Sequence, residues 1–231
     1  MNRLFARFFM LVPVLCGLQG CGRESDPTPE IMEQGIKATS NQDWDSAIKE
    51  FTKVIRLKPE LAAAYSNRAI CYYHKGDLDK ALDDANAAIR LSPELAEAYA
   101  TRGLVWSDKG QYDKAIADCT EAIRIKPGFA DVYCSRASAY VSKGAADKAI
   151  ADCGEAIRLR PGYSKAFLCR GTAYVISGAS DKALADYTEA IRLEPNCADW
   201  YAVRGRLYHA LGKNARAEAD LNRARELGFK P

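Results

Sequence analysis

The sequence predicts an all-α solenoid, a fold built by stacking one helical repeat. Five prolines follow one another at intervals of 34 residues: Pro59, Pro93, Pro127, Pro161 and Pro195. A fixed period of this length is typical of repeat proteins. Within a period, apolar residues at helical spacing occur in two stretches, which in the third period lie on either side of Gly110. Each period is therefore expected to form two helices joined by a turn.

The period divides nearly the whole chain into six repeats. These repeats span 28–61, 62–95, 96–129, 130–163, 164–197 and 198–231, after a predicted targeting segment at 1–20 and a short tether at 21–29. Two short helices cannot bury both of their faces alone, so stability is expected to come from contacts between neighbouring repeats. A stack of this kind acts mainly through the surface it presents, which favours partner binding over catalysis.

Two recurring residues mark the turn inside each repeat. Glycine is expected to end the first helix in a left-handed conformation, at Gly76, Gly110, Gly144, Gly178 and Gly212. Aspartate is expected to cap the N-terminus of the second helix, at Asp45, Asp79, Asp113, Asp147 and Asp181.

Further recurring positions resemble the tetratricopeptide repeat. Position 4 is aromatic in five repeats, as Tyr65, Tyr99, Tyr133, Phe167 and Tyr201. Position 8 is small, as Gly35, Ala69, Gly103, Ala137, Gly171 and Gly205. Position 20 is alanine in all six repeats, as Ala47, Ala81, Ala115, Ala149, Ala183 and Ala217. The resemblance covers 28–231 and implies a right-handed superhelix with a concave groove.

An arginine at position 7 and an aspartate at position 23 form two parallel series. The expected structural ion pairs are Arg68 with Asp84, Arg102 with Asp118, Arg136 with Asp152, Arg170 with Asp186, and Arg204 with Asp220. The arginines alone could form an anion-binding track. The matching acidic series favours one ion pair between the two helices of each repeat, because half-buried charges require partners.

The family resemblance also implies which side chains line the groove. They are Met32, Ile36, Ile70, Tyr73, His74, Leu104, Leu168, Val175 and Ile176, beside charged residues that include Glu97, Asp131 and Arg206. An apolar track with scattered charges suits an extended peptide or an amphipathic helix. The alternative is that several of these side chains pack against neighbouring repeats, since groove and core look alike in sequence.

Two cysteines suggest a different function. The family geometry makes Cys134 and Cys169 neighbours in the groove, where they could form a disulfide or a reactive pair. The simpler interpretation is that both are small apolar core residues, as Cys119 and Cys153 are expected to be.

The first 21 residues predict that the protein is exported from the cytoplasm. Arg3 and Arg7 precede an apolar run at 8–18, which is too short to span a bilayer. The run ends in Leu18-Gln19-Gly20-Cys21, which resembles the bacterial lipobox and implies a diacylglycerol on Cys21. The alternative is an ordinary cleaved signal followed by a free cysteine. Because Gly22 rather than aspartate follows Cys21, the resemblance implies the outer membrane.

Other classes of function find little support. The net charge is +3, and removal of Arg3 and Arg7 leaves 31 basic and 30 acidic residues, or +1, so no strong basic field for nucleic acid is expected. His74 and His209 are far apart, and we expect no metal, catalytic residue or small-molecule substrate. The sequence predicts a lipid-anchored, periplasm-facing scaffold with a protein partner. The competing hypotheses are a soluble periplasmic holdase and a thiol-based redox protein.

Overall fold

The computed structural model describes residues 26–230, and in that range it contains twelve helices and no strand. The first half of the chain, up to Pro127, contains α2 (Thr28–Ser40), α3 (Trp44–Leu57), α4 (Ala62–Lys75), α5 (Leu78–Leu91), α6 (Ala96–Asp108) and α7 (Tyr112–Ile125). The second half, from Gly128, contains α8 (Ala130–Ser142), α9 (Ala146–Leu159), α10 (Ser164–Ile176), α11 (Ser180–Leu193), α12 (Ala198–Ala210) and α13 (Asn214–Glu226). The predicted all-α class is therefore confirmed.

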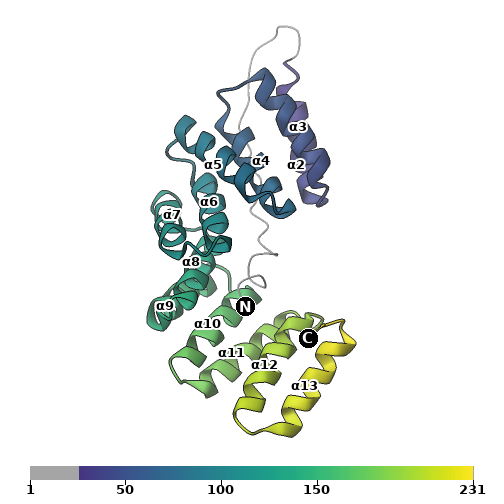
Figure 1. Ribbon diagram of the computed structural model, residues 1–231, viewed down its shortest axis with the longest axis vertical. Coiled ribbons are helices and arrows are strands. Elements are labelled where there is room, and N and C mark those ends of the chain that lie inside the picture. Colours follow the sequence, from purple (N-terminus) through teal and green to yellow (C-terminus); the bar gives the residue numbers. More distant parts are fainter. Residues whose placement is uncertain (1–25, 231) are drawn as a thin grey trace. The chain divides into compact units, whose positions relative to one another are not determined.

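Successive helices pack as pairs, and the pairs stack within each half (Figure 1). In the first half, α3 packs on α4 and α5 packs on α6, so each second helix also contacts the next first helix. In the second half, α9 and α11 contact α10 and α12 in the same way. None of these twelve helices is long and apolar enough to cross a membrane.

The glycines of the turn have the left-handed conformation that the sequence predicts. Their φ angles lie between 69° and 83° at Gly76, Gly110, Gly144, Gly178 and Gly212. At the end of α4, the Gly76 N–H donates to the carbonyl of Tyr73 at 2.9 Å and thereby satisfies one of the last helical carbonyls. In the first repeat Gln42 takes the place of this glycine, with a φ of 59°.

The N-cap prediction was wrong. Asp45, Asp79, Asp113, Asp147 and Asp181 are each the second residue of a helix and lie in its first turn. Each of these helices begins two residues after the residue with the left-handed conformation, so the aspartate already lies inside the helix. The N-cap of α3 is Asp43, whose side chain accepts a hydrogen bond from the Ser46 N–H at 3.1 Å. A carboxylate in the first turn still interacts favourably with the helix dipole.

Where position 8 of a first helix is glycine, it packs against position 24 of the second helix. A Cβ placed on Gly35 would lie 2.6 Å from Cε1 of Phe51, and one on Gly171 would lie 2.5 Å from Cε1 of Tyr187. A Cβ on Gly103 would lie 3.1 Å from Sγ of Cys119. At the same two positions the second and fourth repeats have Ala69 with Ala85 and Ala137 with Cys153. Where a ring fills the space between the helices, position 8 has to be glycine.

Candidate functional site

The five predicted arginine–aspartate pairs form bidentate ion pairs. In each pair the Nε and Nη2 atoms of arginine donate to both carboxylate oxygens at 2.7–2.8 Å. The structure joins Arg68 to Asp84, Arg102 to Asp118, Arg136 to Asp152, Arg170 to Asp186, and Arg204 to Asp220. All five aspartates are buried, with 6–7% of their surface exposed. The hydrogen bonds to Asp84 raise the pKa of the Arg68 guanidinium.

Arg68, Arg102 and Arg204 also reach back to the preceding repeat. Nη1 of Arg68 donates to Thr52 at 3.0 Å, and that of Arg204 donates to Thr188 at 3.0 Å. Arg102 makes the same contact with Asn86 at 2.7 Å. Each of these arginines therefore contacts two second helices, its own and the preceding one. The sequence analysis missed this third contact, although a polar residue 16 positions before the arginine was a visible signal.

Gly154 interrupts this pattern. It occupies the position of Thr52, Asn86 and Thr188 in the fourth repeat, and it has no side chain to accept a hydrogen bond. A Cβ on Gly154 would meet nothing within 4 Å. Among the described residues, the Arg170 side chain is hydrogen-bonded to the two carboxylate oxygens of Asp186. The charged series is therefore a structural feature, since its polar atoms are used to join helices rather than presented to a ligand.

The predicted groove residues divide into three sets by exposure. Met32, Ile70, Tyr73, Leu104 and Leu168 are buried, with 4–5% of their surface exposed, so these five side chains have little area left for a partner. Ile36 and His74 are half-buried, and the imidazole of His74 stacks on Trp44 with 4.4 Å between ring centroids. Val175 is 40% exposed, Ile176 is 44% exposed, and Arg206 is also exposed. For the first set, packing inside the fold is the better interpretation.

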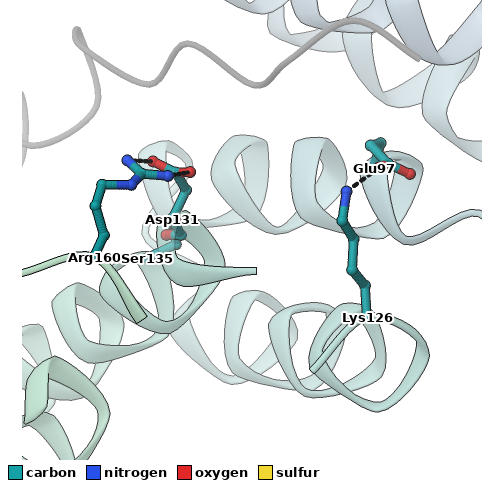
Figure 2. A network of polar contacts seen from close by, with 5 residues as sticks. All are labelled: Glu97, Lys126, Asp131, Ser135 and Arg160. Carbon is teal, nitrogen blue, oxygen red and sulfur yellow. Dashed lines mark hydrogen bonds and ion pairs between the residues drawn. The ribbon is translucent and has the colours of Figure 1, made fainter. Parts of the chain in front are cut away.

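Two charged residues that the sequence analysis placed in the groove are held in ion pairs (Figure 2). In the first half of the chain, Lys126 Nζ lies 2.8 Å from Glu97 Oε1. In the second half, Arg160 Nη2 lies 2.6 Å from Asp131 Oδ2. In both cases the residue that follows a second helix contacts the start of the first helix of the same repeat. The sequence signal was a pair of opposite charges 29 residues apart.

The fifth repeat reverses the signs of this pair. Lys165 stands at the start of α10 and Glu194 follows α11. Burial lowers the pKa of Lys165, and the negative charge of Glu194 is among the effects that oppose this change. Glu194 Oε1 also accepts a hydrogen bond from Ser164 Oγ at 2.6 Å.

The two cysteines of the redox hypothesis lie together, but they are not accessible. All three of Cys134, Cys153 and Cys169 are buried, and the Cys169 thiol interacts with both of the others. Their pKa values are raised: interaction with the Cys169 thiol and burial raise that of Cys134, and burial raises that of Cys153. For Cys169, the Cys134 thiol acts to lower the pKa, but the Cys153 thiol and burial raise it. Because the thiolate is the reactive form, this environment disfavours redox chemistry. Cys21, the predicted lipidation site, lies outside the described residues.

The curated protein Tetratricopeptide repeat protein 36 of Xenopus tropicalis is 39% identical to this chain over 49 residues. That alignment covers 21% of this chain and about a quarter (24%) of the relative's length. Among solved structures, the MamA protein has 27% sequence identity to this chain and a TM-score of 0.60. The alignment covers 74% of this chain and 93% of the MamA chain. The crystal structure of PilW, titled a widely conserved type IV pilus biogenesis factor, is 16% identical, covers 85% of this chain and 91% of its own, and has a TM-score of 0.77.

Family models described as "Tetratricopeptide repeat" match the chain almost continuously. One matches 32–96 and 170–229, a second matches 96–129, and a third matches 130–163. The matched segments cover well over half of the chain and include both compact halves. Together with the paired helices and the recurring turn glycines, these matches show that the chain belongs to the tetratricopeptide repeat family.

Proposed function

We propose that this protein is a non-enzymatic scaffold of the bacterial cell envelope, and that its concave groove binds a peptide or helix of a partner protein. Tetratricopeptide repeat proteins are generally protein–protein interaction scaffolds. The observation that carries the proposal is the contrast between two sets of side chains. The charged series is used inside the fold, whereas Val175 and Ile176 on a first helix remain exposed. Exposed apolar side chains that occur next to each other mark an interaction surface.

We further propose that lipid on Cys21 holds the chain at the outer membrane, the destination that Gly22 implies, with the repeats facing the periplasm. The support is the sequence Leu18-Gln19-Gly20-Cys21 after a short apolar run. Several acyl chains would give firm anchoring, whereas one chain alone binds membranes only marginally. The six residues from Gly22 to Pro27, which precede α2, span at most ~22 Å if extended, so the groove would work near the bilayer surface.

A crosslinking pull-down from membranes tests the groove. The bait is the wild-type chain or a variant with Val175→Asp and Ile176→Asp, which places two charges on the exposed part of α10 without disturbing buried side chains. A matched control carries Leu57→Asp and Leu91→Asp, since these leucines are 51% and 44% exposed at the ends of second helices. We expect the α10 variant to lose partners that the wild type and the control both retain. Recovery of the same proteins with all three baits would refute the groove proposal.

Metabolic labelling with palmitate tests the anchor. We expect the wild-type chain to incorporate label and to fractionate with membranes, and Cys21→Ser to do neither. A labelled Cys21→Ser variant, or an unlabelled wild-type chain in the soluble fraction, would contradict lipidation. The second result would favour the soluble holdase.

A further inference from the structure

One edge of the first half of the chain exposes apolar side chains where second helices end. The last residue of α3 is Leu57, which is 51% exposed, and the last residue of α5 is Leu91, which is 44% exposed. Each is followed two residues later by an exposed proline, Pro59 or Pro93. The four later repeats also have leucine or isoleucine at this position, but there the side chains are half-buried, namely Ile125, Leu159, Leu193 and Leu227. The exposure is therefore particular to the first two repeats.

The two leucines share one edge because of the way α4 packs. This helix contacts both α3 and α5, and short turns join it to them, so it runs antiparallel to each. The ends of α3 and α5 therefore lie on either side of the start of α4 at Ala62. Each of the three helices has 14 residues and is about 21 Å long. The opposite edge, with the turn at Gly76, is therefore about 20 Å away.

The described part of the chain begins at this same edge. Asp26 accepts hydrogen bonds from the Lys58 ammonium and from the Thr28 N–H, and Lys58 directly follows Leu57. These hydrogen bonds lower the pKa of Asp26 to about 2, so its carboxylate stays charged at neutral pH. Cys21 precedes Asp26 by five residues, which span at most ~18 Å if extended. A bilayer that holds lipid on Cys21 is thus within reach of this edge, and the opposite edge is too distant.

Two arginines at this edge are available to lipid phosphates. Arg56 and Arg90 each precede an exposed leucine, and within the described residues neither forms a hydrogen bond or an ion pair. Glu60 is likewise unpaired among these residues, whereas Glu94 is bound by Arg124 Nη2 at 2.9 Å. Two free cations and one free carboxylate give a weak positive balance, so the apolar contact should dominate. An arginine beside an exposed leucine suits a bilayer interface, because the guanidinium binds phosphate and the leucine enters the acyl boundary.

We infer that the edge formed by the ends of α3 and α5 contacts the surface of a phospholipid bilayer. Leu57 and Leu91 enter the interface, and the arginine before each of them lies at the phosphates. The inference rests on the proposed function, because the anchor at Cys21 brings this edge to the membrane. A weak second contact is sufficient in an anchored chain, since the anchor raises its effective concentration at the bilayer. The contact fixes the orientation of the first repeats on the membrane, and its loss leaves the chain anchored.

Fluorescence quenching tests the contact on the full lipidated chain. The chain is reconstituted in vesicles of phosphatidylethanolamine and phosphatidylglycerol that contain a doxyl-labelled phospholipid. An NBD label is attached at Glu60→Cys, in the turn between α3 and α4, or at Gln111→Cys, in the turn between α6 and α7 at the opposite edge. Both are made in a Cys197→Ser background, because the other cysteines of the described repeats are buried.

The two label positions should differ in depth. We expect the doxyl lipid to quench NBD at position 60 at least about twofold more than NBD at position 111, since interfacial insertion brings the first label to the acyl boundary. Equal quenching at the two positions would overturn the inference.

Serine variants then assign the contact to the leucines. Leu57→Ser with Leu91→Ser should reduce quenching at position 60 to the level at position 111, while the chain stays in the membrane fraction. The matched control is Ile176→Ser with Leu211→Ser, which removes two aliphatic side chains of 44% and 37% exposure from the second half of the chain. This control should leave the quenching unchanged. Equal effects of the two variants would contradict a membrane contact of the leucines.

Charge reversal tests the arginines. Arg56→Glu with Arg90→Glu should lower quenching at position 60 by about twofold, because the arginines no longer bind phosphate. The matched control is Lys37→Glu with Lys49→Glu, which reverses two exposed cations of the same half that lie in the last turn of α2 and the first half of α3. We expect little change in this control. An equal loss would show that net charge acts without a contact of the arginines, and would overturn their assignment.

Palmitate labelling separates this inference from the proposed anchor. If the wild-type chain carries the lipid and position 60 is quenched no more than position 111, the anchor stands and the edge contact is wrong. If the wild-type chain carries no lipid, both are wrong. The pull-down decides the groove proposal in either case.

Discussion

Gly171 on α10 lies so close to Tyr187 on α11 that a Cβ at this glycine would come within 2.5 Å of Cε1 of the ring. The tyrosine is 2% exposed, and its hydroxyl lies 3.2 Å from Thr172 Oγ1, so the ring has little freedom to move away. We expect Gly171→Ala to lower the free energy of unfolding by about 1–3 kcal/mol, because it overpacks a filled space. Urea denaturation followed by circular dichroism measures this change.

Gly154→Ala is the matched control for Gly171→Ala, because it is the same substitution inside a helix with open space around it. It should stabilise the fold by about 0.5–1 kcal/mol through helix propensity alone. In a Tyr187→Cys background, which reproduces the natural pair Ala137 with Cys153, Gly171→Ala should no longer be unfavourable. Similar effects of the two alanine substitutions in the wild-type chain would show that the ring does not dictate the glycine.

Removal of one buried aspartate should destabilise the stack strongly. Asp118→Ala leaves the Arg102 guanidinium without a carboxylate, and we expect the free energy of unfolding to fall by about 2–3 kcal/mol, because Asn86 and water compensate only in part. Asp113→Ala, in the first turn of the same helix and exposed, should cost less than about 1 kcal/mol. Equal losses for the two variants would contradict a structural role for the pair.

A side chain at position 154 should supply the hydrogen-bond acceptor that Arg170 lacks in α9. Gly154→Thr supplies a hydroxyl where Arg68 and Arg204 find one in the preceding repeat, and its effect is compared with that of Gly154→Val, which has the same shape. We expect threonine to be more stabilising than valine by about 0.5–1.5 kcal/mol, the net contribution of one hydrogen bond. This difference should vanish in an Arg170→Met background. A difference that persists there would exclude Arg170 as the partner.

The turn between α2 and α3 carries backbone strain. Gln42 has a φ of 59°, in the region that glycine adopts without a steric penalty. Gln42→Gly should raise the free energy of unfolding by up to about 1 kcal/mol, since relief of the strain exceeds the added entropy of the unfolded chain. Thermal denaturation measures the gain. The opposite change at the equivalent position, Gly76→Ala, should destabilise; a stable Gly76→Ala variant would argue against the left-handed turn.

Thiol labelling tests the redox hypothesis. Burial raises the pKa of Cys71 to about 11, so this thiol stays protonated at pH 8, and the buried Cys134, Cys153 and Cys169 should behave alike. We expect iodoacetamide to modify half-buried Cys197 first and the five buried thiols, which include Cys119, only after unfolding in urea, as followed by peptide mass mapping. If Cys134 and Cys169 were labelled as quickly as Cys197 in the folded chain, the redox alternative would regain support.

The sequence was sufficient for the fold because its strongest signals are local. The glycine of each turn requires a left-handed backbone, and that requirement is the same in every repeat. The prediction that this aspartate is the N-cap was wrong because each second helix begins one residue before it. The match between Gly35 and Phe51, or between Gly171 and Tyr187, was visible as a pair of residues 16 apart, but it acquires meaning only when the two helices are placed in contact.

The candidate groove was less predictable. Ile70 and Leu104 on first helices are as apolar as Val175 and Ile176, yet the structure buries the former pair and exposes the latter. Sequence periodicity identifies the face of a helix, but how much of that face a neighbouring helix covers depends on the packing of the whole stack. The pairs Glu97 with Lys126 and Asp131 with Arg160 were likewise missed, because their residues are 29 positions apart and meet only across a complete repeat.

Because Arg68, Arg102 and Arg204 each contact the preceding repeat, we expect the stack to assemble from its N-terminal end. During synthesis the N-terminal part of a chain leaves the ribosome first. Each of these arginines therefore emerges after the threonine or asparagine that it will contact and before its aspartate, 16 residues on either side. The newest helix can dock on a surface that is already folded, and its second helix then closes over the guanidinium, so the repeats can be added one at a time in the order of translation.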